Sequence, residues 1–218
     1  MSGPGPAGGA SAGDADAPLV AAAASGLVAA GEPLLVMLSG GPDSVCLLDV
    51  ALTLGAEVEA VHVDHGLRAD SAADADHCRA LCDQLGVELA VEAVDLSGGG
   101  NLHARARDAR YALAERHAAA DFATGHTASD QAETVLYRLA SSPGRRALLG
   151  MAPRRGRLVR PLLAATAADT RAHCAARGLR WRDDPANSDP RFARARVRAC
   201  RASTTANGAS SKPAACRT

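Results

Sequence analysis

Short apolar runs alternate along this chain with longer stretches in which apolar residues recur every three or four positions. Short continuous apolar runs are typical of strands buried on both faces, and the longer period is typical of helices. The runs predict strands at residues 34–38, 58–63, 87–94, 121–124 and 158–159. The longer stretches predict helices at residues 45–54, 71–85, 101–120, 128–140 and 164–177.

This alternation predicts an α/β fold, a doubly wound parallel sheet of about five strands with helices on both faces. In such a sheet, ligands bind beyond the carboxyl ends of the strands. The chain itself divides into three parts. Residues 1–30 form an N-terminal extension, with disorder expected over residues 1–17 and an Ala-rich helix over 18–31. Residues 31–198 form the folded domain, and residues 199–218 form a tail with no apolar periodicity.

The segment S-G-G-P-D-S, residues 39–44, lies between the first predicted strand and the first predicted helix. Its two glycines allow a tight turn and a close approach of the backbone to an anion. Backbone N–H groups at the start of a helix, together with the hydroxyls of Ser39 and Ser44, can hold phosphate oxygens. The position therefore predicts a phosphate site formed by Ser39, Gly40, Gly41, Pro42, Asp43 and Ser44.

Asp43 is unusual in such a loop, because a carboxylate repels phosphate. It is explained if a divalent cation such as Mg²⁺ lies between the carboxylate and the phosphate groups. The alternative is a simple Gly-Pro turn that precedes the helix. Against that alternative is the location of the segment, directly after the first buried strand.

The formal net charge of zero hides a strong asymmetry between the two parts of the chain. Residues 1–137 carry 6 basic and 20 acidic side chains, whereas residues 138–218 carry 18 basic and 4 acidic ones. Such a split indicates that the basic part faces a polyanion, although a coding bias toward Arg is an alternative source of the arginines. Aromatic residues make up only 2% of the chain, which argues against a stacking platform for single-stranded nucleic acid.

The six cysteines form no C-x-x-C pair, and no apolar run approaches the length of a membrane span. The N-terminus has no basic segment ahead of an apolar one, as a secretory signal would. We therefore expect a reduced, cytoplasmic protein without a membrane partner.

Several motifs together resemble a known family. Residues 39–44 resemble the PP-loop of the N-type ATP pyrophosphatases, enzymes with a Rossmann-like fold that cleave ATP between its α- and β-phosphates. Within that superfamily, five further segments are similar to the bacterial tRNA(Ile)-lysidine synthases, and the resemblance extends from about residue 34 to residue 198. They are residues 63–68, 101–111, 125–134, 160–163 and 184–187.

The resemblance implies ATP and Mg²⁺ as cofactors, free L-lysine as a substrate and tRNA(Ile) with a CAU anticodon as the partner. It implies catalytic roles for Asp43, Arg107, Arg110, His126 and Asp130, with Asp43 and Asp130 near the metal. The product would be lysidine, formed by a ligase that joins lysine to C2 of a cytidine through an adenylated intermediate. For the individual residues, a solvated His, a helpful acid at a helix start and an ion-paired helix face remain the alternatives.

The chain also departs from the family pattern at His103, Ser129, Ala195 and residues 141–144, and it stops where the family continues into helical tRNA-binding parts. A truncated nucleotide-binding module without catalysis is therefore one alternative. Another is a different PP-loop enzyme such as a tRNA thiolase. Thiolases that use an iron–sulfur cluster or a persulfide need paired cysteines, which this sequence lacks.

Overall fold

The computed structural model describes residues 13–64, 71–94, 102–141 and 144–183. The predicted disorder before residue 13 and the predicted tail at 199–218 lie outside these residues. The described residues divide into two compact units, residues 13–129 with 152–183, and residues 130–151. In chain order the elements are α1 (Ala17–Ser25), β1 (Pro33–Met37), α2 (Pro42–Thr53), β2 (Glu57–Asp64), α3 (Ser71–Leu85), β3 (Glu88–Ala93), α4 (Leu102–His117), β4 (Asp121–Ala123), α5 (Ala128–Ser141), the 3₁₀ helix η1 (Arg145–Leu149), β5 (Arg154–Arg155), β6 (Leu158–Val159) and α6 (Ala167–Ala176).

The first unit contains a sheet of six strands in the order β3-β2-β1-β4-β6-β5. All strand pairs are parallel except the β5–β6 pair, which is antiparallel. The predicted fold class is therefore confirmed, with one strand more than expected. The extra strand is β5, whose two residues are both exposed and carry no apolar signal.

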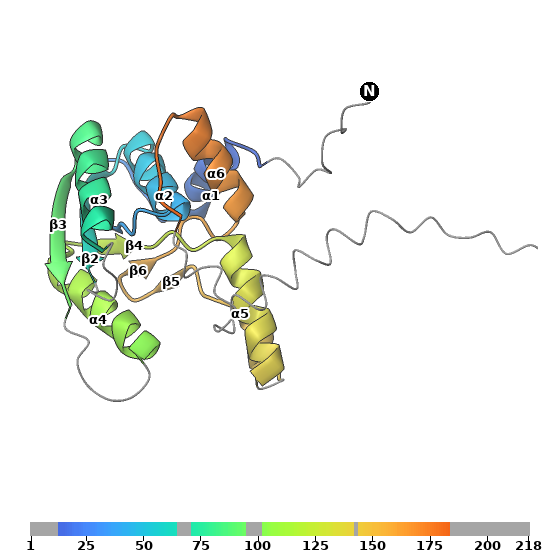
Figure 1. Ribbon diagram of the computed structural model, residues 1–218. Coiled ribbons are helices and arrows are strands. Elements are labelled where there is room, and N and C mark those ends of the chain that lie inside the picture. The colour runs from blue at the N-terminus through green and yellow to red at the C-terminus, as the bar shows by residue number, and fades with distance from the viewer. Residues whose placement is uncertain (1–12, 65–70, 95–101, 142–143, 184–218) are drawn as a thin grey trace, which may run out of the picture. The chain divides into compact units, whose positions relative to one another are not determined.

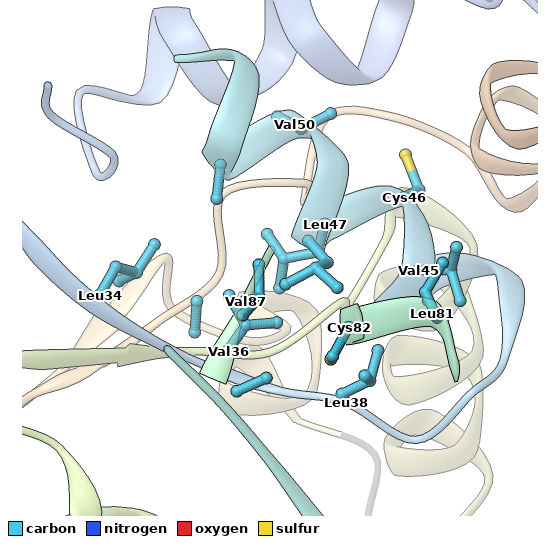
Figure 2. Packing of buried hydrophobic residues seen from close by; sticks show 14 of the residues in the cluster. Leu34, Val36, Leu38, Val45, Cys46, Leu47, Val50, Leu81, Cys82 and Val87 are labelled. Carbon is cyan, nitrogen blue, oxygen red and sulfur yellow. The ribbon is translucent and has the colours of Figure 1, made fainter. Parts of the chain in front are cut away.

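Strand β1 is buried on both faces because its residues alternate between two hydrophobic clusters. Leu34 and Val36 pack with residues of α2 and α3 (Figure 2), whereas Leu35 and Met37 pack on the opposite face with Leu113 of α4. Figure 1 shows α4 on the other side of the sheet from α2 and α3. Helices therefore cover both faces of the sheet, as predicted. Aliphatic side chains and small residues fill most of the core, and Phe122 is its largest fully buried side chain.

Two helix starts differ from their predicted positions. Helix α2 begins at Pro42, three residues earlier than the apolar pattern indicates, because Pro is well suited to a first helical position. Helix α6 begins at Ala167, where Thr166 and Asp169 form a reciprocal capping box that the pattern from residue 164 did not reveal. The Ala-rich helix expected over 18–31 is α1, which ends at Ser25 because Gly26 adopts a left-handed conformation.

The strand order reverses between β1 and β4. From β1 the chain proceeds outward through β2 to β3, and it then returns to β4 on the other side of β1. Open α/β sheets bind ligands at such a reversal of strand order, beyond the carboxyl ends of the strands. Residues 39–44 follow β1, and residues 124–127 follow β4.

Candidate functional site

Residues 39–44 form a tight loop between β1 and α2. Gly40 has a φ of 81°, a conformation that disfavours other residues, and a Cβ there would lie 3.4 Å from Cys78 Sγ and from His77 Cδ2. Gly41 is the extended N-cap of α2, and Pro42 follows it in the first turn of the helix. The loop therefore presents the positive end of the α2 dipole at the carboxyl edge of the sheet.

The two predicted hydroxyls meet inside this loop. Ser44 Oγ accepts a hydrogen bond from the Ser39 backbone N–H at 3.1 Å and donates to the Gly41 carbonyl at 2.9 Å. It also lies 3.0 Å from Ser39 Oγ. Ser44 is buried and Ser39 is exposed, so the inner hydroxyl fixes the loop while the outer one faces solvent. This arrangement is preorganised for an anion at the start of a helix.

Asp43 lies in the first turn of α2, and α6 holds its carboxylate. The Thr170 hydroxyl, which is fully buried, donates to Asp43 Oδ1 at 2.5 Å. A charge-assisted hydrogen bond of this kind restrains the carboxylate to one orientation. Sequence reasoning missed Thr170, because nothing in the pattern of α6 shows that one of its hydroxyls reaches residue 43.

The loop after β4 lies directly against the phosphate loop. A Cβ at Gly125 would lie 2.6 Å from the Asp43 carbonyl oxygen and 3.0 Å from the Ser44 nitrogen, so the two backbones touch. The next residue, His126, has Nδ1 2.7 Å from the Thr124 hydroxyl. The structure thus brings His126 and Asp43 into neighbouring loops of one unit, as the sequence predicted for this edge of the sheet.

Asp130 belongs to the second compact unit, so its pairing with Asp43 stays a prediction. Within that unit, Gln131 ties the first turns of α5 to the segment after η1. Its Nε2 donates to the Met151 carbonyl at 2.9 Å, and its Oε1 accepts from the Met151 N–H at 2.5 Å. Glu133 and Thr134 on the same helix are buried.

Among the described residues, no group of three or more His, Cys, Asp or Glu side chains is placed to hold a metal ion. A carboxylate beside a phosphate loop fits Mg²⁺, which is commonly bound through one or two carboxylates together with substrate phosphates and water. The carboxylate of Asp43, beside the phosphate loop, is the described group best placed for that role.

Arg107 and Arg110 lie on α4 beside Tyr111. Their guanidinium carbons lie 5.3 and 6.0 Å from the centre of the Tyr111 ring, within the range of cation–π contacts. Tyr111 in turn packs against Phe122 of β4, with ring centres 6.4 Å apart. The structure therefore brings both arginines to one aromatic side chain at the face of the sheet that α4 covers.

The segment that follows α6 crosses the phosphate loop, which the sequence did not reveal. The Arg182 N–H donates to the Gly40 carbonyl at 2.9 Å, and Arg182 Nε lies 2.7 Å from Asp74 of α3. His77 lies beside this segment with its Nε2 buried and without a partner among the described residues. Burial lowers the pKa of His77, and the nearby Arg182 charge lowers it further.

Behind the loop, a buried polar network joins α2 to α6. His173 Nε2 lies 2.8 Å from Asp49 Oδ2, and its Nδ1 lies 2.8 Å from the Ala15 carbonyl. Arg177 Nε donates to the same carboxylate at 3.1 Å. Because Asp49 is buried, these partners are what makes its charge tolerable there. No sequence motif identified this network.

Two predicted segments, residues 65–68 and 184–187, lie outside the described residues.

The reversal of strand order, the glycine loop after β1 and the closely packed loop after β4 define a nucleotide-binding α/β domain of the PP-loop class. A family model described as a PP-loop domain matches residues 20–201, and the chain belongs to this family.

Curated relatives of the chain are tRNA(Ile)-lysidine synthases. That of Mycolicibacterium paratuberculosis is 49% identical over 169 residues, which cover 77% of this chain and 52% of the relative. That of Thermobifida fusca is 44% identical over 78% of this chain and 55% of the relative. That of Thermus thermophilus is 42% identical over 73% of this chain and 33% of the relative. The chain thus spans between a third and about half of the length of these proteins.

A solved structure with the same fold is the U34-tRNA thiolase NcsA from Methanococcus maripaludis with its [4Fe-4S] cluster. It matches with a TM-score of 0.67 and 16% sequence identity, over 87% of this chain and 73% of that one. At this level of identity the likeness concerns the fold. In the described parts of the chain, no helix is long and apolar enough to cross a bilayer.

Proposed function

We propose that the chain performs the ATP-dependent formation of lysidine in tRNA(Ile). In this reaction, O2 of the cytidine in the CAU anticodon attacks the α-phosphate of ATP, and pyrophosphate leaves. The amine of free L-lysine then attacks C2, AMP leaves with the former O2, and a proton is lost. The observation that carries the proposal is the preorganised loop at residues 39–44, in a chain that is 49% identical to the tRNA(Ile)-lysidine synthase of Mycolicibacterium paratuberculosis over 169 residues.

The loop supplies the ATP site. Ser39, Gly40, Gly41, Pro42, Asp43 and Ser44 surround the phosphates, where backbone N–H groups and the α2 dipole favour negative charge. His126, on the adjoining loop, assists adenylation. Arg107 and Arg110 stabilise negative charge that develops on the phosphates, as guanidinium groups do in phosphoryl transfer.

Mg²⁺ is proposed to be held by Asp43 and Asp130 together with the phosphates. When bound, it neutralises the charge of the departing pyrophosphate. The Thr170 hydrogen bond supports this role, because it fixes one oxygen of the Asp43 carboxylate without neutralising the charge of the group.

The partner is proposed to be tRNA, and the basic residues of the 138–218 region are proposed to contact its backbone. A cytoplasmic location agrees with these substrates, since ATP, lysine and unmodified tRNA meet there.

The experiment is an assay of AMP and pyrophosphate release with ATP, lysine and unmodified tRNA(Ile). We expect AMP formation that requires all three substrates and is lost in Asp43→Asn. Asp76→Asn is the matched control, because Asp76 is an exposed residue of α3 paired only to Arg79 among the described contacts. The proposal fails if ATP does not bind, or if Asp43→Asn behaves like the control.

The same assay distinguishes a second function. It is a nucleotide-binding module that holds ATP without turnover. ATP binding that depends on Asp43, with no AMP formed under any combination of substrates, would support this second function over the first.

A further inference from the structure

Arg160 follows β6 and is almost fully buried, with 3% of its surface exposed. Strand β6 is parallel to β4, and the Thr124 N–H donates to the Val159 carbonyl at 3.1 Å. Strands β1, β4 and β6 therefore all end at one edge of the sheet. Arg160 lies at the edge where the loops after β1 and β4 form the nucleotide site.

The buried guanidinium lacks a full set of partners. Its Nη1 donates to the Ala152 carbonyl at 2.7 Å, and the nearby Tyr111 side chain raises the pKa of the group. Its Nε is buried and has no partner among the described residues. A buried donor without an acceptor costs about 1–3 kcal/mol, and more when the group is charged.

The charges around Arg160 increase this cost. Burial lowers the pKa of Arg160, and the positive charges of Arg107 and Arg155 lower it further, while Tyr111 opposes the effect. Within the described part of the chain, no carboxylate forms an ion pair with Arg160 or Arg107. Two nearby arginines differ, since Arg154 of β5 pairs with Asp121, and Arg157, between β5 and β6, pairs with Glu115.

Tyr111 connects the two arginines. It lies near enough to Arg160 to raise the pKa of that group, and the face of its ring receives the guanidinium of Arg107 at 5.3 Å. Two guanidinium groups from different elements thus lie beside one side chain at the ligand-binding edge, and no ion pair to a carboxylate of the described residues balances either of them. A phosphate group, with several oxygen acceptors and a negative charge, would satisfy both.

We propose that Arg160 and Arg107 together bind a phosphate group, with Tyr111 as the residue that positions both guanidinium groups. The site adds Arg160 to the residues of the proposed function, on which this inference rests. Two sources carry the same chemistry, the polyphosphate of ATP and a phosphodiester of the RNA backbone.

The test compares four proteins, the wild type and the Arg107→Gln, Arg160→Lys and Arg154→Gln variants, by calorimetric titration. The probes are inorganic pyrophosphate, ATP with Mg²⁺, and unmodified tRNA(Ile), all at one ionic strength. We expect Arg107→Gln and Arg160→Lys each to weaken the binding of either pyrophosphate and ATP or tRNA(Ile) by about tenfold, equal to about 1.4 kcal/mol. Arg154→Gln removes a positive charge of the neighbouring strand that is already paired, so it should bind like the wild type.

The pattern of loss identifies the source. Weaker pyrophosphate and ATP binding with unchanged tRNA binding assigns the site to the nucleotide, and the reverse pattern assigns it to the RNA. Unchanged binding of all three probes in Arg107→Gln overturns the proposal, and so does equal weakening in Arg154→Gln. Arg107 is only partly buried, so its variant keeps the test valid if Arg160→Lys does not fold. Because binding is measured directly, a failure of lysidine formation alone does not affect this result.

Discussion

At the scale of single residues, Asp43 combines a place in the phosphate loop with a hydrogen bond from a distant helix. It lies in a loop shaped for phosphate, and its Oδ1 accepts the hydroxyl hydrogen of a fully buried threonine from α6. The threonine contributes an oriented dipole and no charge, so the carboxylate keeps its negative charge for a cation. Asp43 was predicted from its loop, whereas Thr170 could be found only after α6 was placed against α2.

Thr170→Val keeps the shape of the side chain and removes the hydroxyl. We expect the Mg²⁺ concentration that half-saturates ATP binding to rise about tenfold to a hundredfold, since a hydrogen bond to a charged group contributes about 1.5–3 kcal/mol. Thr170→Ser keeps the hydroxyl and should stay close to the wild type. A Mg²⁺ titration at fixed ATP measures the effect, and equal curves for the valine and serine variants would contradict it.

Cys78 gives a prediction about pH. Burial raises the pKa of its thiol from 9.0 to about 12, so the folded protein holds this proton more tightly than the unfolded chain. The contribution of Cys78 to the free energy of unfolding is therefore complete below pH 9 and declines as the pH rises toward 12. By pH 10.5 the loss should reach about 2 kcal/mol.

Urea unfolding of the wild type and of Cys78→Ala at pH 8 and at pH 10.5 measures this loss. The alanine variant is less stable at pH 8 but should lose less stability between the two pH values. Parallel losses in the two proteins would show that the thiol does not titrate as described.

At the scale of elements, the site depends on how closely the loops after β1 and β4 approach each other. Glycine is required at position 125 because a Cβ there would lie too close to neighbouring backbone atoms. The backbone conformation is not the reason, since the φ of Gly125 is not among the positive values that favour glycine. A side chain at this position would meet the backbone of Asp43 and Ser44, which cannot rotate away. The β4–α5 loop thus sets the position of the phosphate loop.

Gly125→Ala should force the two loops apart. We expect a loss of about 1–3 kcal/mol in the free energy of unfolding, as for other overpacked positions, together with weaker ATP binding. Gly144→Ala is the matched control, because a Cβ there meets nothing within 4 Å and the φ of −180° is extended. Denaturant unfolding and ATP titration of both variants provide the measurement, and similar losses in the two would contradict the packing argument.

The elements also show what sequence patterns can and cannot reveal. The parallel strands and the four helices that follow β1 to β4 were predicted because each buries apolar residues with a regular period. Strand β5 was missed because its only residues are exposed arginines. The Asp49–His173 pair and the Arg182–Gly40 hydrogen bond join residues more than 120 positions apart, and no local pattern encodes such pairs.

At the scale of the whole molecule, the charge asymmetry makes a prediction for the proposed RNA partner. The basic region, residues 138–218, should bind the RNA backbone with release of counterions. The logarithm of the affinity should therefore fall linearly with the logarithm of the salt concentration. Filter binding of tRNA(Ile) over a series of salt concentrations measures the slope. Glu57→Gln, an exposed change on β2 in the acidic part, should leave the slope unchanged. An affinity independent of salt would argue against a backbone contact.

The hydrogen bond from Arg182 to Gly40 has a consequence for the order in which the protein matures during translation. The phosphate loop is synthesised early, but its last described backbone partner emerges from the ribosome some 140 residues later. The Thr170 contact with Asp43 has the same property. Contacts of such long sequence separation form late, because closing the intervening chain lowers its conformational entropy before the new contact can stabilise the fold. A nascent chain therefore gains its finished nucleotide loop only when almost the entire unit has left the ribosome.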